Sequence, residues 1–395
     1  MKLLFVMDSL GTGGIQTSLV NLLNRIDYSR FEVDLYLFHY EEGYRKRIPE
    51  NVRILRGSKL LQIAGASAKE AKKMGAVPYL ARMQLSIMCR LFGADAVYGV
   101  LLYMAKKLGP YDCAIAYSNN ITMRGTYFGI NKHVLRNVQA ERKISWLHVD
   151  YRAMGLDCRI NRKEYEMFDA IVCVSKAARD TFLGCCPEFR EKTFVMYNLA
   201  DKDRVLSLSR KKLPVRISGG QKNIITAARL DRNKNQADCL RAAAWLKKKG
   251  VPFHWYFAGD GPEKKMLEKM AAALSIGQEV TFLGNVQNPY PLMRACDIFV
   301  SASLSESYPL SIAEALLLNL PSVVHEYPAA DELIKNGNGV VTHGFKSMCR
   351  ELHRLLTDDA YYKRRRLAAH FDADDDRNLQ VFYSLAGGLD VRKAL

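Results

Sequence analysis

The sequence predicts an α/β protein with two doubly wound domains, each built on a parallel β-sheet. Three observations lead to this expectation. Short, nearly continuous apolar runs alternate with longer segments of helical periodicity, which is typical of strands buried on both faces and of the helices that connect them. The alternation stops in a polar and basic stretch at 206–222 and then begins again. The 395 residues suffice for two or three domains with separate cores.

The expected strands of the first half are apolar runs rich in β-branched and aromatic residues, and they lie at 2–7, 32–38, 112–117, 143–148, 170–174 and 193–197. Helices are expected between them, for example at 16–25 and 176–183. We therefore assign 1–205 to an N-terminal Rossmann-like domain.

We interpret 206–222 as a linker, after which a second set of strands is expected at 223–228, 254–258, 279–283, 297–300, 322–324 and 339–342. Helices are expected at 236–249, 262–274 and 309–318. We assign 223–370 to a C-terminal domain. Because ligands of such sheets bind at the carboxyl ends of the strands, we expect a cleft between the two domains.

The formal net charge is +17, from 58 Lys and Arg against 41 Asp and Glu. This excess excludes an acidic surface and indicates anionic partners, such as phosphate-bearing substrates, anionic lipids or nucleic acid. The N-terminal part of the excess is concentrated in 43–107, which holds 13 basic and 3 acidic residues. Basic residues interleaved with Leu, Met, Ile and Tyr fit either a helix on an anionic membrane or a solvated face of ordinary core helices.

The nine cysteines are scattered from Cys89 to Cys349 without a C-x-x-C pair. We therefore expect neither a disulfide framework nor a zinc site, and a reducing compartment. The apolar N-terminal run ends at Asp8, which is too early for a signal peptide, and no run approaches the ~20 apolar residues of a membrane span. A cytoplasmic location is expected, with attachment to the inner face of the cell membrane as an open alternative.

Two short motifs follow strands of the second half. Arg229 and Lys234 lie in AARLDRNKN, and two cations at the carboxyl end of a strand suit a pyrophosphate. In AGDGP, Gly259 and Gly261 permit a tight turn, and Pro262 is suited to the first position of a helix. Solvated basic loops and βα turns are common, so each motif alone is weak.

The strongest motif is SLSESYPLSIAEALLLNLP at 303–321. Glu306 and Glu314 have the spacing E-x7-E, and Pro309 is expected to open a helix whose first amides can hold phosphate oxygens. A carboxylate also accepts hydrogen bonds from the vicinal hydroxyls of a sugar. The bare spacing could equally be helix-start charge, but the full string following the two motifs above favours a binding site.

The first half contributes two features at expected strand ends. Gly13 and Gly14 lie between the first strand and the first helix, where backbone amides can approach an anion. The G-x-G-x-x-G pattern and a P-loop Lys are both absent, which weighs against NAD binding and ATP hydrolysis. His148 ends a later strand, and a lone His is more often structural than catalytic.

From about 223 to 345 the ordered set of motifs resembles the donor-binding domain of retaining GT-B glycosyltransferases of family four, and a weaker likeness spans nearly the whole chain. The resemblance implies the GT-B fold, in which two Rossmann-like domains face a central cleft. It implies that Arg229 and Lys234 bind the donor diphosphate. It further implies that Glu314 holds the ribose and that Glu306 contacts the donor sugar.

The same resemblance implies that Gly13 and Gly14 face the donor phosphates and the acceptor, and that His148 lies by the transferred sugar. The expected donor site is completed by the following residues: Gly259, Ser307, Pro309 and Leu310. The sequence departs from the family pattern at Ser307 and Asn319, where Gly is usual. Residues 371–395 resemble the last GT-B helix, which crosses back onto the first domain.

The expected function is that of a retaining, metal-independent hexosyltransferase without a cofactor. The expected donor is a nucleotide diphosphate sugar, with UDP favoured over GDP, and the acceptor is a saccharide or lipid-linked saccharide in surface polysaccharide assembly. Two alternatives stay open, a non-catalytic GT-B partner subunit and a basic nucleic-acid-binding protein. No helix-turn-helix, RNA-binding aromatic motif or zinc finger supports the last.

Overall fold

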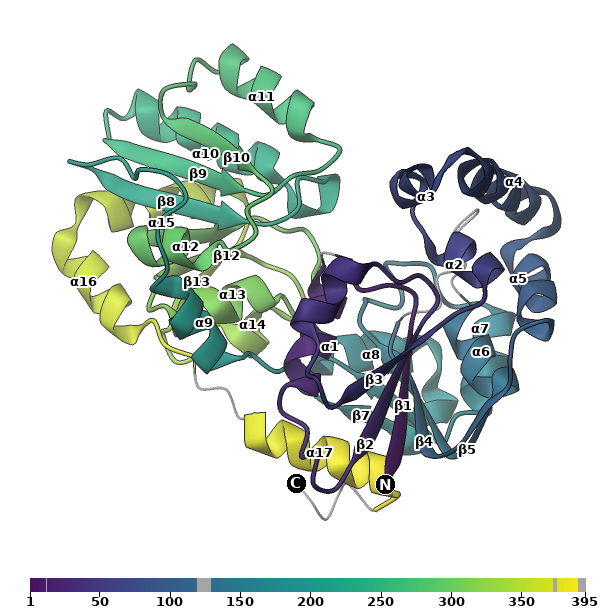
Figure 1. The fold of residues 1–395 in the computed structure, drawn as a ribbon. Coiled ribbons are helices and arrows are strands. Elements are labelled where there is room, and N and C mark those ends of the chain that lie inside the picture. The colour runs from purple at the N-terminus through teal and green to yellow at the C-terminus, as the bar shows by residue number, and fades with distance from the viewer. Residues whose placement is uncertain (12, 119–128, 372–374, 390–395) are drawn as a thin grey trace. The chain divides into compact units, whose positions relative to one another are not determined.

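The computed structural model describes residues 1–11, 13–118, 129–371 and 375–389. The chain divides into two compact units, of which the first comprises Met1–Leu199 with Asp374–Leu395 and the second comprises Ala200–Ala373. Each unit is built on one sheet with helices on both faces (Figure 1). Among the described residues, no helix combines the length and the apolar composition needed to cross a bilayer.

The sheet of the first unit has seven parallel strands in the order β3-β2-β1-β4-β5-β6-β7. Its strands are β1 (Lys2–Met7), β2 (Glu32–Leu37), β3 (Val52–Arg56), β4 (Leu108–Ala116), β5 (Val138–Leu147), β6 (Ala170–Cys173) and β7 (Thr193–Val195). Its helices are α1 (Gly14–Leu23), α2 (Lys59–Gly65), α3 (Ala68–Met74), α4 (Ala76–Phe92), α5 (Ala94–Tyr103), α6 (Ile130–Asn137), α7 (Arg159–Glu166), α8 (Lys176–Cys185) and α17 (Asp375–Gly387).

The central strand β1 shows how this sheet buries both faces. Its side chains alternate, as the pleat requires. Leu4 and Val6 belong to one core cluster together with Val134 of α6. On the other face Phe5 stacks on Phe382 of α17, with 6.0 Å between the ring centroids. The continuous apolar run LLFVM is therefore the signature of a strand covered by helices on both sides.

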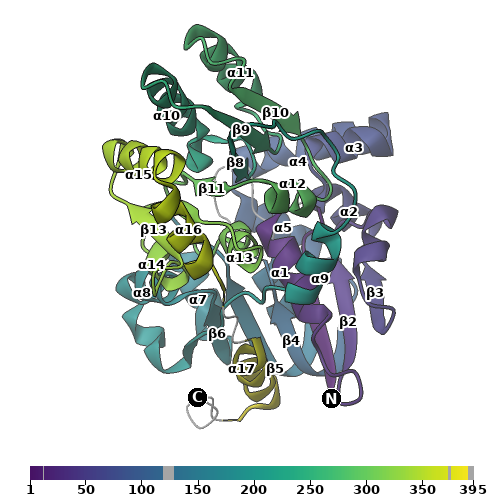
Figure 2. The same cartoon turned by 90° about the vertical axis from the view of Figure 1, so that its left-hand side faces the viewer.

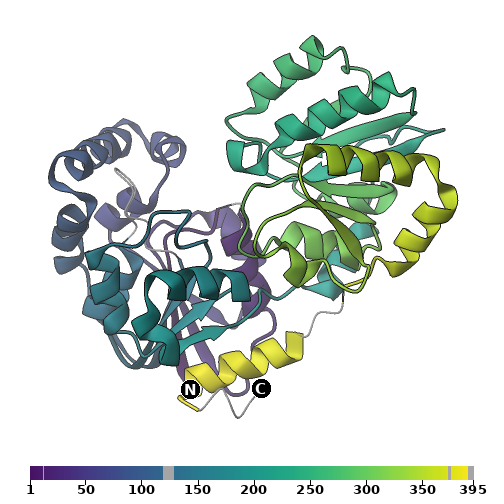
Figure 3. The same ribbon diagram turned by 180° about the vertical axis from the view of Figure 1, so that it is seen from behind.

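Helix α17 is part of the first unit although it lies at the other end of the sequence (Figure 3). Tyr383 stacks on Phe31 at 5.0 Å, and Asp376 accepts an ion pair from Arg25 at 2.9 Å. Arg142 of β5 donates a hydrogen bond to the carbonyl of Leu385 at 3.1 Å. Of the terminal segment expected at 371–395, residues 372–374 and 390–395 lie outside the described part of the chain.

The sheet of the second unit has six parallel strands in the order β10-β9-β8-β11-β12-β13. Its strands are β8 (Lys222–Ala227), β9 (Phe253–Ala258), β10 (Val280–Gly284), β11 (Ile298–Ser301), β12 (Ser322–His325) and β13 (Gly339–Thr342). Its helices are α9 (Lys202–Ser209), α10 (Gln236–Lys248), α11 (Lys264–Ala273), α12 (Tyr290–Ala295), α13 (Leu310–Leu317), α14 (Ala330–Leu333), α15 (Phe345–Thr357) and α16 (Asp359–Ala368).

In both sheets the chain starts near the middle, runs to one edge and returns to the other side, which is the doubly wound arrangement. The two parallel-sheet domains predicted from the sequence are thereby confirmed. Strand β3 was not expected. It is an edge strand whose one partner among the described residues is β2, and Arg53 and Arg56 on it are exposed, so its sequence VRILR lacks a continuous apolar run.

The boundary between the units also differs from the expected linker at 206–222. The second unit begins at Ala200, and α9 packs beside α12 and α13 (Figure 2). Val205 of α9 is buried, and Asn288 donates a hydrogen bond to the carbonyl of Leu208 at 3.0 Å. The first residues of the expected linker are therefore a packed helix, whereas 210–221 has no helix or strand.

Candidate functional site

The carboxyl ends of β8, β9 and β11 meet at one edge of the second sheet, because these strands are parallel neighbours or near neighbours. The loops that follow them carry Arg229, Gly259 and Glu306. Backbone hydrogen bonds join the loops directly. The amide of Ala228 donates to the carbonyl of Ala258 at 3.1 Å, and the amide of Leu304 donates to the carbonyl of Asn233 at 2.8 Å. The fold thus brings three separate motifs into one connected edge.

Two glycines allow the 258–262 turn to lie against the loop after β8. A Cβ on Gly259 would lie 1.9 Å from the carbonyl oxygen of Ala228, and a Cβ on Gly261 would lie 2.2 Å from that of Leu230. Both neighbours are backbone atoms, which cannot rotate away. The turn is further held by the amide of Leu230, which donates to the carbonyl of Asp260 at 3.1 Å. Any side chain at these two positions would push the loops apart.

Lys234 and Glu306 form an ion pair across two of these loops. The side chain of Lys234 is 24% exposed and that of Glu306 is 15% exposed, so both are largely covered yet still reach solvent. Asp231 caps the short turn that holds Lys234 by accepting from its amide at 3.1 Å. Asn233 donates from its side chain to the carbonyl of Ser305 at 2.7 Å, which holds the loop of Glu306 in place.

Arg229 lies on the same edge but is less constrained than Lys234. Its side chain is 71% exposed, and it lies 3.8 Å from the carboxylate of Asp231. A surface pair of this length contributes little to holding the guanidinium in one place. Arg229 is therefore free to swing toward an anion in solution, whereas Lys234 is already positioned.

Helix α13 starts at this edge of the sheet. Pro309 precedes it in an extended conformation, with φ −76° and ψ 106°, and among the described residues no side chain caps the helix. Its first turn carries no acidic residue. Pro309 and Leu310 are buried and Ser307 is partly buried, so Leu310 offers its backbone rather than its side chain. The positive end of the helix dipole is thus available to an anion.

Glu314 lies in the second turn of α13, as its spacing from Pro309 predicts. Tyr290, the first residue of α12, donates a hydrogen bond from its hydroxyl to the carboxylate at 2.8 Å. Burial raises the pKa of Glu314 to about 7, while the Tyr290 hydrogen bond and the charge of Arg204 act in the opposite direction. The group is therefore close to changing its charge near neutral pH.

Sequence reasoning missed two tyrosines of this edge. One is Tyr290, which meets Glu314 only through the packing of α12 on α13. The other is Tyr327, whose pKa is raised by burial and by the nearby charge of Glu306. The hydroxyl of Tyr327 is buried and has no hydrogen-bond partner within the described part of the chain. Neither lies in a recognisable motif, so only the contacts identify them.

In the first unit, Gly13 and Gly14 lie between β1 and α1, as expected. A Cβ on Gly14 would meet nothing within 4 Å, and one on Gly13 would meet only the flexible side chain of Gln16. Neither glycine is therefore required by packing among the described residues. Helix α1 has no acidic residue in its first turn and no side-chain cap from the described residues. The turn leaves space for a ligand to approach the backbone amides.

His148 directly follows β5 at the same sheet edge as this turn. It is 8% exposed and packs against the rings of Tyr117 and Trp146, with centroids 4.7 Å and 6.3 Å away. Burial lowers the pKa of His148 to about 3, so the imidazole is neutral at physiological pH. Tyr117 is held in turn by a hydrogen bond of 2.8 Å to the hydroxyl of Ser18.

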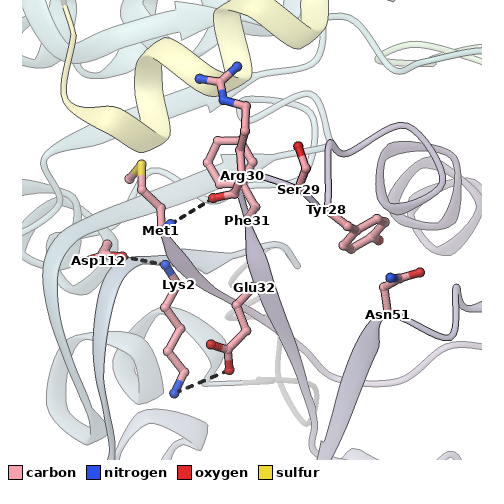
Figure 4. Close-up of a pocket in the computed structure, with 9 residues that line it drawn as sticks. All are labelled: Met1, Lys2, Tyr28, Ser29, Arg30, Phe31, Glu32, Asn51 and Asp112. Carbon is pink, nitrogen blue, oxygen red and sulfur yellow. Dashed lines mark hydrogen bonds and ion pairs between the residues drawn. The ribbon is translucent and has the colours of Figure 1, made fainter.

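The pocket that Figure 4 draws lies at the opposite, amino-terminal edge of the first sheet, with a volume of about 570 Å³. Several of its polar groups pair with one another. The amino terminus of Met1 donates to the carbonyl of Arg30 at 2.9 Å, and Lys2 pairs with Glu32 at 3.7 Å (Figure 4). It contains none of the candidate residues, and its internal pairing marks it as structural.

Comparison with known proteins finds a family match in the second unit. Residues 210–370 match the family described as "Glycosyl transferases group 1". The putative glycosyltransferase EpsF of Bacillus subtilis is 36% identical over 115 residues, which are 29% of this chain and 29% of EpsF.

Two further likenesses extend over nearly the whole chain or all of it. A Campylobacter jejuni protein named N-acetylgalactosamine-N,N'-diacetylbacillosaminyl-diphospho-undecaprenol 4-alpha-N-acetylgalactosaminyltransferase is 25% identical over 367 residues, which are 92% of each chain. The crystal structure of Anabaena HepE in complex with UDP and glucose has a TM-score of 0.62 at 19% identity and covers 100% of this chain and 97% of that chain. The whole chain therefore has the GT-B fold, and its residues 210–370 match the family of group 1 glycosyltransferases.

Proposed function

We propose that the protein is a retaining, metal-independent hexosyltransferase that takes its sugar from a nucleotide diphosphate donor, with UDP favoured over GDP. Its acceptor is a saccharide or lipid-linked saccharide in surface polysaccharide assembly. One observation carries the proposal. The Lys234–Glu306 pair lies in loops next to the start of α13, which no side chain of the described residues caps, and Glu314 lies in the second turn of the same helix. Cation, helix amides and two carboxylates together match a sugar diphosphate.

Two relatives support the choice of donor and acceptor. HepE, whose fold this chain shares, was crystallised in complex with UDP and glucose. The Campylobacter relative is named for transfer to an acceptor carried on diphospho-undecaprenol. These are properties of those proteins, and we extend them to this chain as a hypothesis.

In the proposed reaction the leaving diphosphate gains negative charge as the bond to the anomeric carbon breaks. Lys234, Arg229, the loop amide of Ser307 and the first amides of α13, which begin at Leu310 after Pro309, would stabilise that charge. Glu314 would accept hydrogen bonds from the ribose, and Glu306 from the sugar. Displacement of Lys234 from Glu306 by the diphosphate would free the carboxylate for this contact. A donor phosphate oxygen would take the proton of the acceptor hydroxyl.

To residues of the first unit we assign roles toward the sugar and the acceptor. A neutral His148 would donate a hydrogen bond to the transferred sugar without adding charge. Gly13 and Gly14 would leave room for the acceptor and the donor phosphates next to the amides of α1. Gly259 would act indirectly, by keeping the loop of Arg229 close to the sheet edge.

A thermal-shift screen of UDP-hexoses, UDP-N-acetylhexosamines and GDP-mannose tests the donor, followed by donor hydrolysis with the best binder. We expect UDP-sugars to raise the melting temperature and hydrolysis to persist in EDTA. NMR of the released or transferred sugar should show the anomeric configuration of the donor. Stabilisation by GDP-mannose alone, loss of activity in EDTA, or inversion would each contradict one part of the proposal.

A further inference from the structure

Helix α4 presents an apolar stripe to solvent instead of to the core. The stripe consists of Val77, Leu80, Ile87, Met88 and Leu91, which are 77%, 60%, 52%, 46% and 71% exposed. Their spacing places them on one side of a helix with 3.6 residues per turn. Single exposed apolar residues are ordinary, but a continuous stripe along a helix of 17 residues marks an interaction surface.

The opposite side of α4 explains why the helix is oriented this way. Arg82 donates to the carbonyl of Ala66 at 2.8 Å and to the hydroxyl of Ser86 at 2.6 Å. Cys89 is buried in a small core with Tyr98 of α5. The inward side of α4 therefore carries specific polar and apolar contacts with the rest of the unit. Rotating the helix to bury the α4 stripe would break all of them.

The exposed apolar surface continues on the next helix. Val100, Tyr103 and Met104, at the end of α5, are 65%, 89% and 70% exposed and share one helical face by their spacing. Helices α3, α4 and α5 form an outer layer at one end of the first unit, beyond α2 (Figure 1). The apolar side chains thus belong to a peripheral layer and not to an edge of the main core.

The charges around the α4 stripe are mostly positive, and the acidic residues nearest to α4 in the sequence are Glu70 of α3 and Asp95 of α5. Lys69 and Lys72 of α3 and Arg90 of α4 are exposed. From Ala71 to Ala94 the sequence contains no acidic residue. Exposed apolar side chains flanked mainly by cations complement the acyl chains and negative headgroups of an anionic bilayer. A helix of this length, about 26 Å at 1.5 Å per residue, offers its whole side to such a surface.

We propose that the α4 stripe, flanked by Lys69, Lys72 and Arg90, binds the surface of an anionic lipid bilayer with α4 lying in the plane of the interface. This assigns the positive excess of 43–107 to a membrane surface and selects one of the two interpretations left open by the sequence. Binding follows from the surface of the first unit alone. Only the use of this membrane binding, which is to bring the enzyme to a lipid-linked acceptor, rests on the proposed function.

Co-sedimentation of the full chain with vesicles of phosphatidylglycerol and phosphatidylethanolamine, compared with phosphatidylcholine alone, tests the proposal. We expect binding to the anionic vesicles at physiological salt and weaker binding as salt rises. The triple variant Leu80→Gln, Ile87→Gln, Leu91→Gln should lower the partition constant about tenfold or more, because three apolar side chains no longer enter the interface. The double variant Lys72→Gln, Arg90→Gln should lower it about tenfold through lost headgroup attraction.

A matched control changes three exposed apolar residues outside the stripe, in the triple variant Met167→Gln, Met266→Gln, Leu367→Gln. These side chains are 59%, 44% and 84% exposed, and their removal should leave vesicle binding unchanged. Thermal shift by the donor, measured without lipid, should be the same for all variants, so a failure of donor binding is separable from a failure of membrane binding.

Three outcomes would overturn the membrane assignment. The first is no binding to anionic vesicles at physiological salt. The second is binding that the stripe variant retains in full. The third is a dimer of the wild-type chain in analytical ultracentrifugation that the stripe variant no longer forms, together with no binding of the wild-type chain to vesicles. This result would assign the stripe to a second copy of this chain.

Discussion

Two glycine turns at the carboxyl edges of the two sheets look alike in sequence and differ in their physical role. In the second unit, Gly259 and Gly261 press against backbone atoms of the neighbouring loop, and a Cβ at either position would overlap a carbonyl oxygen. In the first unit, Gly14 faces open space and Gly13 faces only a flexible side chain. One pair is explained by packing, and the other leaves space that the described residues do not fill.

The difference teaches how a glycine in a βα turn should be interpreted. A glycine that is sterically required supports the loops that carry Arg229, Lys234 and Glu306, so its effect on activity is indirect. A glycine with free space around it has no packing reason among the residues that the structure describes, and room for a ligand that approaches the backbone is a physical reason for it. In order of decreasing expected effect, the Gly261 and Gly14 variants below test this distinction, and the Lys234 and Tyr290 variants test residues of the supported edge.

Replacing Gly261 by Ala should destabilise the second unit by about 3 kcal/mol or more, because the new Cβ meets the backbone of Leu230 and neither loop can give way. Urea denaturation of purified protein measures the change. Gly277→Ala is the matched control, since a Cβ there meets nothing within 4 Å. Equal stability of the two variants would show that the turn is looser than its contacts indicate.

Replacing Lys234 by Ala should reduce transfer roughly a hundredfold or more while leaving the fold intact, because a preformed cation facing the leaving diphosphate is lost. The control is Arg232→Ala, which removes a neighbouring cation whose side chain is 92% exposed. Steady-state kinetics with circular dichroism as a folding check distinguish the two. Normal turnover by the Lys234 variant would rule out its assignment to the diphosphate.

Replacing Tyr290 by Phe should raise the KM for the donor about tenfold near neutral pH with little change in kcat, because one hydrogen bond to a charged group is lost. That hydrogen bond lowers the pKa of Glu314 against the effect of burial, so its removal should raise this pKa further. If the carboxylate binds the ribose, donor affinity should increase as the pH rises through about 7 in the wild type.

In the Tyr290→Phe variant the same increase in affinity should occur at higher pH. Donor titration by calorimetry over a series of pH values measures both curves. A KM effect without a shift of the pH profile would mean that Tyr290 contacts the donor itself and does not act through Glu314.

Replacing Gly14 by Ala should give the smallest effect and the most informative one. Stability should stay the same or rise by about 0.5–1 kcal/mol, because Ala favours the helix and meets no neighbour. Transfer should nevertheless fall about two- to fivefold if the turn contacts an anionic substrate. Unchanged activity in a stabilised variant would leave the open space at Gly14 without a function.

Much of the architecture could be predicted from the sequence because it depends on local patterns. Each strand that we expected from an apolar run is present in the structure. The order of motifs along the chain placed Arg229, Lys234 and Glu306 at the ends of neighbouring strands. Parallel strands share one carboxyl edge, so linear order was enough to bring these loops together. Even the departure at Asn319 has a local reason, since it adopts a left-handed φ of 56° that Asn tolerates better than most residues.

Other features depend on contacts between segments that are distant in sequence, and only the tertiary structure decided them. The Tyr290 hydrogen bond that acts on Glu314, the buried hydroxyl of Tyr327 and the neutral state of His148 all follow from what packs around each side chain. The orientation of the α4 stripe toward solvent also depends on contacts between distant segments. Its composition suited a core helix or a membrane surface equally well, and the contacts of Arg82 and Cys89 on its inner side determine which face meets solvent. A one-dimensional pattern specifies the period of a helix, but its rotation is set by the neighbours it packs against.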